Sequence, residues 1–190
     1  YRIIRHHKLK PLVVSFDHGF FRPGHLRNVE RTLKKLGADF LVFRPNMRVV
    51  GQLMLESLKR KGDFCWHCHS GVFAYPMQIA VKFNIPLIMW GEINWDISGM
   101  FDADDYVEFS ARVRHEHDLR GYEWYDFLDD PDDKLSEKDM IWAKYPSDEE
   151  IIRVGARGLY IGNFFKWDPN WHVQMVQEKY GWKPAEKPFE

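Results

Sequence analysis

The sequence has few of the features that mark membrane-spanning, disulfide-rich or nucleic-acid-binding proteins. Its 190 residues include no apolar run that approaches the ~20 residues of a membrane helix, and we expect no signal peptide. Only two cysteines are present, so a secreted disulfide scaffold is not expected. The formal net charge is -1, which gives no overall attraction to nucleic acid or to a membrane surface. We expect a cytoplasmic protein that binds no nucleic acid and inserts in no membrane.

Apolar runs alternate with helical periodicity in the first half of the chain. Runs typical of buried parallel strands occupy residues 11–16, 39–43 and 85–90. Between the first two runs, helical spacing ends at Gly37, and between the last two one helix ends at Gly62 and another is predicted over 71–83. This order predicts an α/β fold with a three-layer parallel sheet and right-handed crossovers.

The pattern divides the chain into three regions. Residues 1–94 form the predicted α/β core. Residues 95–146 are aromatic and acidic, and we expect an irregular insertion with short helices there. Residues 147–190 are predicted to form a C-terminal extension that packs on the core. It contains a strand near 159–162 and a helix that Asp168 caps.

Polar residues follow all three predicted strands, with Arg44 after the second. Asp17 and His18 come directly after the first strand, and Gly91, Glu92 and Asn94 follow the third. Because the carboxyl ends of parallel strands meet at one edge of a sheet, we expect these residues to lie at the same edge. Open α/β sheets bind their ligands there.

Both cysteines lie in one short segment before the predicted third helix, at Cys65 and Cys68 with His69 beside them. The spacing is that of covalent haem attachment, of half a zinc site, of a redox pair, or of two thiols that merely pack. Haem does not suit an α/β domain of this kind. A structural zinc site needs four ligands, and no second cysteine pair supplies them. Because a helix N-terminus lowers a thiol pKa, we favour an active-site role.

Five segments together are similar to one known family. The run Pro11–Gly19 resembles the second strand of PP-loop ATP pyrophosphatases. The segments Gly62–Pro76 and Asn84–Glu92 resemble the N-acetyl sugar amidotransferases, which belong to that group. The segments Arg157–Tyr160 and Glu178–Pro184 fit the same family. The resemblance covers most of the chain and is weakest over the predicted insertion.

The resemblance implies an adenine nucleotide alpha hydrolase fold and an ATP-dependent reaction. With ATP and magnesium, the acetamido oxygen of a sugar would be adenylylated. Ammonia from a separate glutaminase subunit would then displace AMP and leave an acetamidino group. Such proteins act in surface-polysaccharide synthesis, including lipopolysaccharide O-antigen. Zinc is not favoured as a cofactor. The candidate catalytic residues are Cys65, Cys68, His69 and Glu92, and the candidate cofactor-binding residues are Phe16, Asp17, His18, Gly91 and Asn94.

The chain departs from this family at one motif. The Ser-Gly-Gly-x-Asp-Ser loop that grips pyrophosphate is not in the sequence. It would follow a first strand upstream of Tyr1, and we expect an N-terminal portion there. The chain as given is expected not to hydrolyse ATP to AMP and pyrophosphate. Two other functions stay open: a PP-loop enzyme that modifies tRNA or transfers sulfur, and a non-catalytic α/β interaction module.

Overall fold

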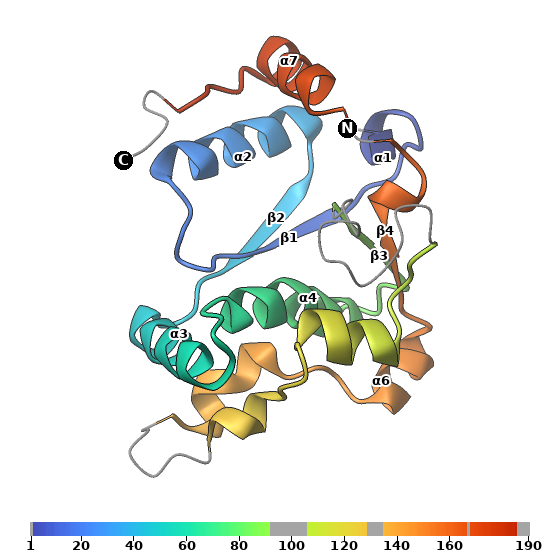
Figure 1. The fold of residues 1–190 in the computed structure, drawn as a ribbon. Helices are drawn as coiled ribbons and strands as arrows, with labels where there is room; N and C mark the ends of the chain where they lie inside the picture. Colours follow the sequence, from blue (N-terminus) through green and yellow to red (C-terminus); the bar gives the residue numbers. More distant parts are fainter. Residues whose placement is uncertain (1, 92–105, 129–134, 167, 186–190) are drawn as a thin grey trace. The chain divides into compact units, whose positions relative to one another are not determined.

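The computed structural model describes residues 2–91, 106–128, 135–166 and 168–185 (Figure 1). These residues group into two compact units, which we call unit 1 and unit 2. Unit 1 is drawn from residues 1–43 and 168–190, and unit 2 from residues 44–167. The grouping cuts across the three regions taken from the sequence, because the last helix belongs with the first two strands.

Unit 1 pairs two short strands in parallel and adds helices from both ends of the chain. Its strands match residue for residue, from Leu12 opposite Asp39 to Phe16 opposite Phe43. The second helix ends at Gly37, whose left-handed backbone (φ 67°) suits glycine. The elements of unit 1 are α1 (Arg2–Arg5), β1 (Leu12–Phe16), α2 (Pro23–Leu36), β2 (Asp39–Phe43) and α7 (Pro169–Tyr180).

Hydrogen bonds join α2 to the segment that follows α7. The Asn28 amide donates to the Lys183 carbonyl at 2.7 Å, and the Lys183 N–H donates to the Asn28 side chain at 3.0 Å. The Arg31 guanidinium donates to the Gly181 carbonyl at 2.5 Å. Asn28 is only 4% exposed, and its amide is satisfied in both directions. The C-terminal segment is therefore fixed against one face of α2.

Unit 2 contains a second parallel strand pair within a mostly helical structure. The pair runs from Leu87 opposite Arg157 to Trp90 opposite Tyr160. The elements are α3 (Met47–Lys61), α4 (Trp66–Lys82), β3 (Leu87–Trp90), the π-helix η1 (Val113–Asp118), the 3-10 helices η2 (Trp124–Phe127), η3 (Glu137–Ala143) and η4 (Ile161–Asn163), α6 (Asp148–Val154) and β4 (Arg157–Tyr160).

Buried aromatic residues hold α4 to the rest of unit 2. Trp66 is fully buried, and its indole N–H lies 3.0 Å from both the Leu119 and the Tyr122 carbonyls. Its ring packs on Phe127 with centroids 4.3 Å apart. A buried cluster of unit 2 consists of Phe73, Met77, Trp90, Val107, Val113, Ala156 and Tyr160.

The start of α4 differs from the sequence prediction. A helix over 71–83 was expected, whereas α4 begins at Trp66. The Asp63 carboxylate accepts the Cys65 N–H at 2.8 Å, and the Cys65 carbonyl accepts the Cys68 N–H at 3.0 Å. With Trp66 buried as an anchor, the helix therefore begins five residues earlier, and the cysteine segment forms its first turn.

The strand arrangement confirms a mixed α/β structure but not the single sheet. The two parallel pairs, β1 with β2 and β3 with β4, are separate sheets among the described residues. That one sheet edge gathers the strand ends stays a prediction, because no described pairing joins the two pairs. Glu92 and Asn94, which belong to that prediction, lie outside the described residues. Within the described part of the chain, no helix has the length and apolar character to cross a membrane.

Candidate functional site

The end of β1 is a tight, hydrogen-bonded turn. The Asp17 carboxylate accepts the Gly19 N–H at 3.0 Å, and the His18 Nδ1 accepts the Phe20 N–H at 3.2 Å. Gly19 has a φ of 91°, which favours glycine. Burial lowers the pKa of His18, although the Asp17 charge opposes this shift. His18 is therefore a neutral ring with Nδ1 as its acceptor.

Phe16 has a packing role in β1. It is 3% exposed, and its ring stacks on Phe43 at a centroid distance of 6.0 Å. Among the described residues, Phe16 does not line the pocket that unit 1 contains. Gly91, the glycine of the candidate set, follows β3 and is exposed, and an added Cβ would have no described atom within 4 Å.

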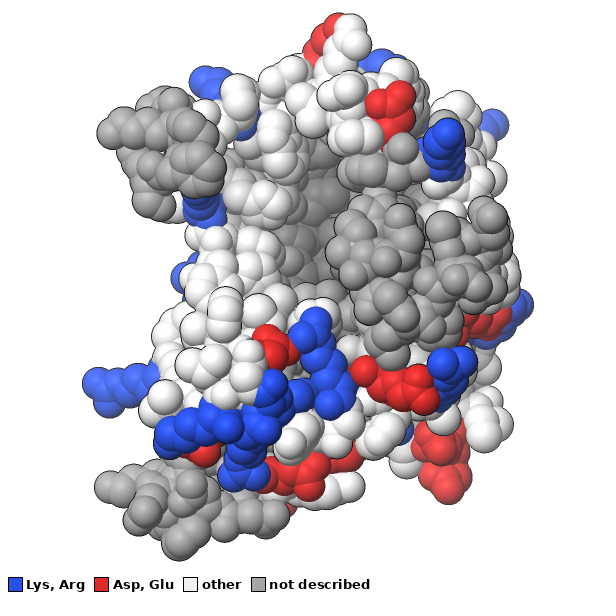
Figure 2. All heavy atoms as spheres, viewed as in Figure 1, with Lys and Arg blue, Asp and Glu red and all other residues white. Residues whose placement is uncertain are grey.

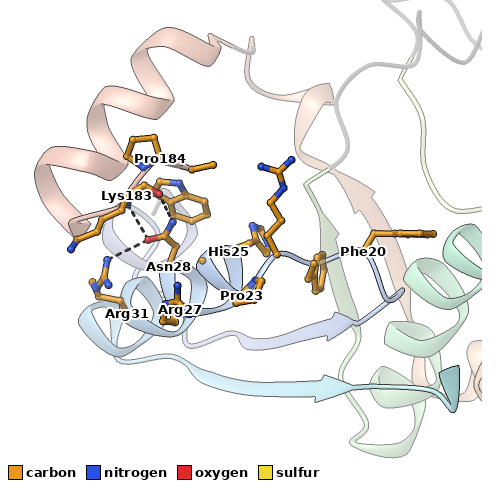
Figure 3. Close-up of a pocket in the computed structure, with 13 residues that line it drawn as sticks. Phe20, Pro23, His25, Arg27, Asn28, Arg31, Lys183 and Pro184 are labelled. Carbon is orange, nitrogen blue, oxygen red and sulfur yellow. Dashed lines mark hydrogen bonds between the residues drawn. The ribbon is translucent and has the colours of Figure 1, made fainter. Parts of the chain in front are cut away.

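A pocket of about 790 Å³ lies at the start of α2, and we call it the α2 pocket. Its walls come from two segments of unit 1, residues 20–31 and 182–185 (Figure 3). The volume is in the range of small-molecule sites. The pocket begins two residues after His18, so the turn that ends β1 leads directly to it.

Aromatic rings connect the β1 turn with the α2 pocket. The His18 ring contacts Phe21 edge to face at 4.4 Å, and Phe21 packs on His25 at 4.8 Å. His25 in turn meets Trp182 at 5.8 Å. His18 thus lies at one end of a row of rings that forms part of the pocket wall. A planar ligand ring could stack on such a surface.

The α2 pocket also carries several cations. The pocket is lined by Arg22, Arg27, Arg31 and Lys183. The first turn of α2 has no acidic residue. The Arg31 side chain is held by the Gly181 carbonyl. Arg27 is exposed and makes no ion pair or hydrogen bond with any described residue. Cations beside stacked rings suit an anion that carries an aromatic group, such as a nucleotide.

Both cysteines are free thiols at the start of α4 in unit 2. Burial and the adjacent Asp63 carboxylate raise the pKa of Cys65, and the thiol donates a hydrogen bond to Asp63. The lowered pKa expected at a helix N-terminus is not found, because an acidic side chain occupies the same turn. Among the described residues, no three or more His, Cys, Asp or Glu side chains are grouped to hold a metal ion. Cys65 is thus a protonated thiol at neutral pH.

His69 is held neutral by a basic neighbour. The Arg120 guanidinium lies 2.7 Å from His69 Nε2 and is also paired with Asp63. Because a guanidinium only donates, Nε2 accepts and the proton is on Nδ1. Burial, followed by the positive charge of Arg120, lowers the pKa of His69 to about 4. Arg120 has a φ of 52°, so an unusual backbone conformation places its side chain here.

A buried aspartate binds a second histidine in the same region. The Asp118 carboxylate is fully buried. One of its oxygens lies 2.9 Å from His117 Nδ1, and the other accepts the Tyr145 hydroxyl at 2.6 Å. Burial raises the pKa of Asp118, while the bonds from His117 and Tyr145 oppose the shift. Burial and the Asp118 charge raise the pKa of Tyr145.

The two histidines bring these groups together. The rings of His69 and His117 meet edge to face at 5.9 Å, and both lie beside the start of α4. We call Asp63, His69, His117, Asp118, Arg120 and Tyr145 the histidine cluster. Of its members, only His69 is among the candidate residues predicted from the sequence. The others lie in a loop or in the predicted insertion, and the only signal for them was the unusual density of charge in Arg114-His115-Glu116-His117-Asp118.

The comparisons with known proteins add no family. The sequence matches no protein-family model, and it matches no curated protein sequence.

Acid is expected to destabilise unit 2 through His69. Its pKa is about 4 when folded, against an ordinary value of 6.5, so the unfolded chain takes up the proton first as the pH falls. Stability is therefore full above about pH 6.5 and falls toward pH 4, by about 2 kcal/mol after allowance for partial exposure. Urea unfolding measured across this pH range should show the slope. The slope of stability against pH should flatten in the His69→Gln variant. It should persist in the His115→Gln variant, because His115 is exposed in the wild type. Equal slopes in all three proteins would contradict the assignment.

Proposed function

We propose that this protein is an ATP-dependent amidotransferase. It converts the acetamido group of a sugar into an acetamidino group, with ammonia supplied by a glutaminase partner, in the cytoplasmic stage of surface-polysaccharide synthesis. The proposal rests on the sequence resemblance to N-acetyl sugar amidotransferases. Three features of the structure support it: the strand pairing, the α2 pocket of unit 1 and the histidine cluster of unit 2.

The pattern of strand pairing is the observation that supports it best. In a doubly wound parallel sheet, the strands can lie in the order 3-2-1-4-5. Strand 2 then pairs with strand 3, and strand 4 pairs with strand 5. Strand 1 lies between strand 2 and strand 4. If β1 to β4 correspond to strands 2 to 5, the order requires the two pairs β1–β2 and β3–β4. Both pairs are parallel, and no β1–β3 ladder is found among the described residues. The three-layer PP-loop fold is consistent with these pairings.

The α2 pocket supports nucleotide binding by unit 1. The resemblance assigns Phe16, Asp17 and His18 to the nucleotide, and the pocket begins at Phe20, two residues after His18. Its row of rings suits a base, and its cations suit phosphates. Asp17 and His18 do not line the pocket themselves. They form the turn between β1 and the pocket, and we assign them a role in positioning the residues that line the pocket.

The histidine cluster supports amide chemistry in unit 2. It gathers neutral and charged hydrogen-bonding groups beside two half-buried thiols, and clusters of perturbed groups are frequent at functional sites. A protonated Cys65 suits the positioning of a polar substrate better than nucleophilic attack. This observation counts against the sulfur-transfer alternative, which requires a thiolate. On the face seen in Figure 2, basic side chains lie next to acidic ones, so that face offers no uniformly basic surface for tRNA.

Nucleotide binding can be tested on the chain as given. AMP and ATP are expected to bind the chain in calorimetric titration, and Arg27→Glu should weaken binding by roughly tenfold because it reverses a charge in the pocket. The matched control is Lys10→Glu, an equal charge change in unit 1 at an exposed residue outside the pocket. Equal weakening by both variants would show only an effect of net charge. A chain that binds neither nucleotide would favour the non-catalytic interaction module.

A further inference from the structure

The first turn of α4 places its two cysteines on one face of the helix. Cys65 directly precedes α4, and Cys68 is the third residue of the helix. Both are partly exposed thiols. Trp66 and His67, which lie between them, are fully buried. Because positions i and i+3 share a helix face, the two buried side chains anchor the turn while both thiols stay on its partly exposed side.

Hydrogen bonds of the backbone fix the spacing of the two cysteines. The Cys65 carbonyl accepts the Cys68 N–H at 3.0 Å and the His69 N–H at 3.1 Å. In such a turn, Cα atoms three residues apart are separated by about 5 Å. A disulfide bridges Cα atoms that are roughly 4.4–6.8 Å apart. The two thiols can therefore be joined without a large movement of the backbone, as in other Cys-x-x-Cys segments at a helix start.

Asp63 influences how this pair reacts. Its carboxylate accepts the Cys65 N–H at 2.8 Å, and it also accepts the Cys65 thiol. Burial and this carboxylate raise the pKa of Cys65, although the charge of Arg120 opposes the shift. Because the thiolate is the reactive form, exchange at Cys65 is slow at neutral pH. A thiolate would also stabilise the reduced state, and Cys65 lacks that stabilisation, so the equilibrium favours the disulfide.

We propose that Cys65 and Cys68 form a reversible disulfide, with low-molecular-weight disulfides such as glutathione disulfide as the oxidant, and that Asp63 slows its formation. The inference goes beyond the proposed function and does not depend on it. A disulfide removes the hydrogen that Asp63 accepts from the Cys65 thiol. Oxidation would therefore also change the contacts of Asp63 within the histidine cluster.

The reaction consists of two thiol–disulfide exchanges. One cysteine loses its proton, and its thiolate attacks a sulfur of the small disulfide. The S–S bond of the small disulfide breaks, and one small thiol leaves with the electron pair and takes up a proton. The second cysteine attacks the protein sulfur of this mixed disulfide in the same way and releases the second small thiol. Two protein thiols are thus oxidised to one disulfide, and one small disulfide is reduced to two thiols.

Equilibration with glutathione and glutathione disulfide tests the pair in the wild-type protein. Trypsin cleaves after Lys61 and Lys82, so the peptide Gly62–Lys82 carries both cysteines. We expect this peptide to become lighter by two hydrogen atoms, without bound glutathione, and to be restored by dithiothreitol. The folded protein should reach this state with about tenfold less glutathione disulfide than the urea-unfolded protein, because the turn holds the thiols side by side.

Three variants complete the test. Cys65→Ser should stop at a glutathione adduct on Cys68. Asp63→Asn keeps an oxygen that accepts the Cys65 N–H but removes the charge, so it should speed disulfide formation by about threefold or more. Asp39→Asn, the same change at an exposed residue of unit 1, should not.

Two results would overturn the disulfide site. One is a wild-type peptide that carries two glutathione adducts in place of a disulfide. The other is equal oxidation of the folded and the unfolded protein, which would show only the chemistry of two neighbouring cysteines. Equal rates of disulfide formation in Asp63→Asn and in the wild type would overturn the role of Asp63.

Discussion

Replacing Gly158 by alanine is expected to destabilise unit 2 by about 3 kcal/mol, the upper range for an overpacked core. A Cβ added to Gly158 would lie 2.2 Å from Trp90 Cζ3 and 2.7 Å from Phe109 Cβ. The Trp90 ring has little room to move, because it stacks on Tyr160 at 5.4 Å and packs on Phe73 at 5.6 Å. The glycine in β4 is therefore needed for the close approach of the indole.

A second glycine of unit 2 supplies the control. Gly51 lies in the interior of α3 and is exposed, and an added Cβ would have no atom within 4 Å. Gly51→Ala should stabilise the chain by about 0.5–1 kcal/mol, because alanine favours the helix. Urea unfolding of the two variants measures both changes. If Gly158→Ala unfolds at the same urea concentration as the wild type, the packing of Trp90 against β4 is wrong.

Replacing Cys65 by serine, which keeps a hydrogen-bond donor but changes its length and polarity, is expected to slow amidine formation in the full-length protein and to leave the melting temperature nearly unchanged. Cys65 is half-buried at the first turn of α4, and its thiol bonds to Asp63 beside the histidine cluster. The change removes a group that we place against the substrate, but it removes little packing. Thermal unfolding and the amidine assay, run on the same preparations, separate these two effects.

The outcome also decides between the roles left open for the cysteines. If Cys65 held a structural zinc, Cys65→Ser would release metal and lower the melting temperature, because bound metal contributes folding energy. If turnover and stability both stay at the wild-type level, the cysteines are packing residues. One zinc held tightly per chain would overturn the substrate-positioning role.

Local signals in the sequence predicted several helix ends correctly. Asp168 caps α7 with its side chain, as its residue type and position indicated. The helices before Gly37 and Gly62 end there, as predicted. These features depend on contacts within a few residues, which a sequence shows directly.

The features that were missed depend on contacts between distant residues. The early start of α4 requires Trp66 to be buried against residues 119–127, and no periodicity shows that. The histidine cluster brings together Asp63, Arg120 and Tyr145 from three segments. Its members are charged or polar and have no repeating spacing, so composition alone marked their segment as an irregular insertion. The raised pKa of Cys65 likewise follows from one carboxylate that is placed only by the fold.

The measurement that tests the central claim most directly is the fate of ATP and of heavy-nitrogen ammonium in the full-length protein. The substrates to supply are sugars with an N-acetyl group, free and linked to nucleotides. The account predicts that ATP is converted to AMP and pyrophosphate only when the sugar is present, and that the labelled nitrogen appears in an acetamidino group of that sugar. Conversion of ATP to ADP, or formation of AMP without label in the sugar, would contradict it.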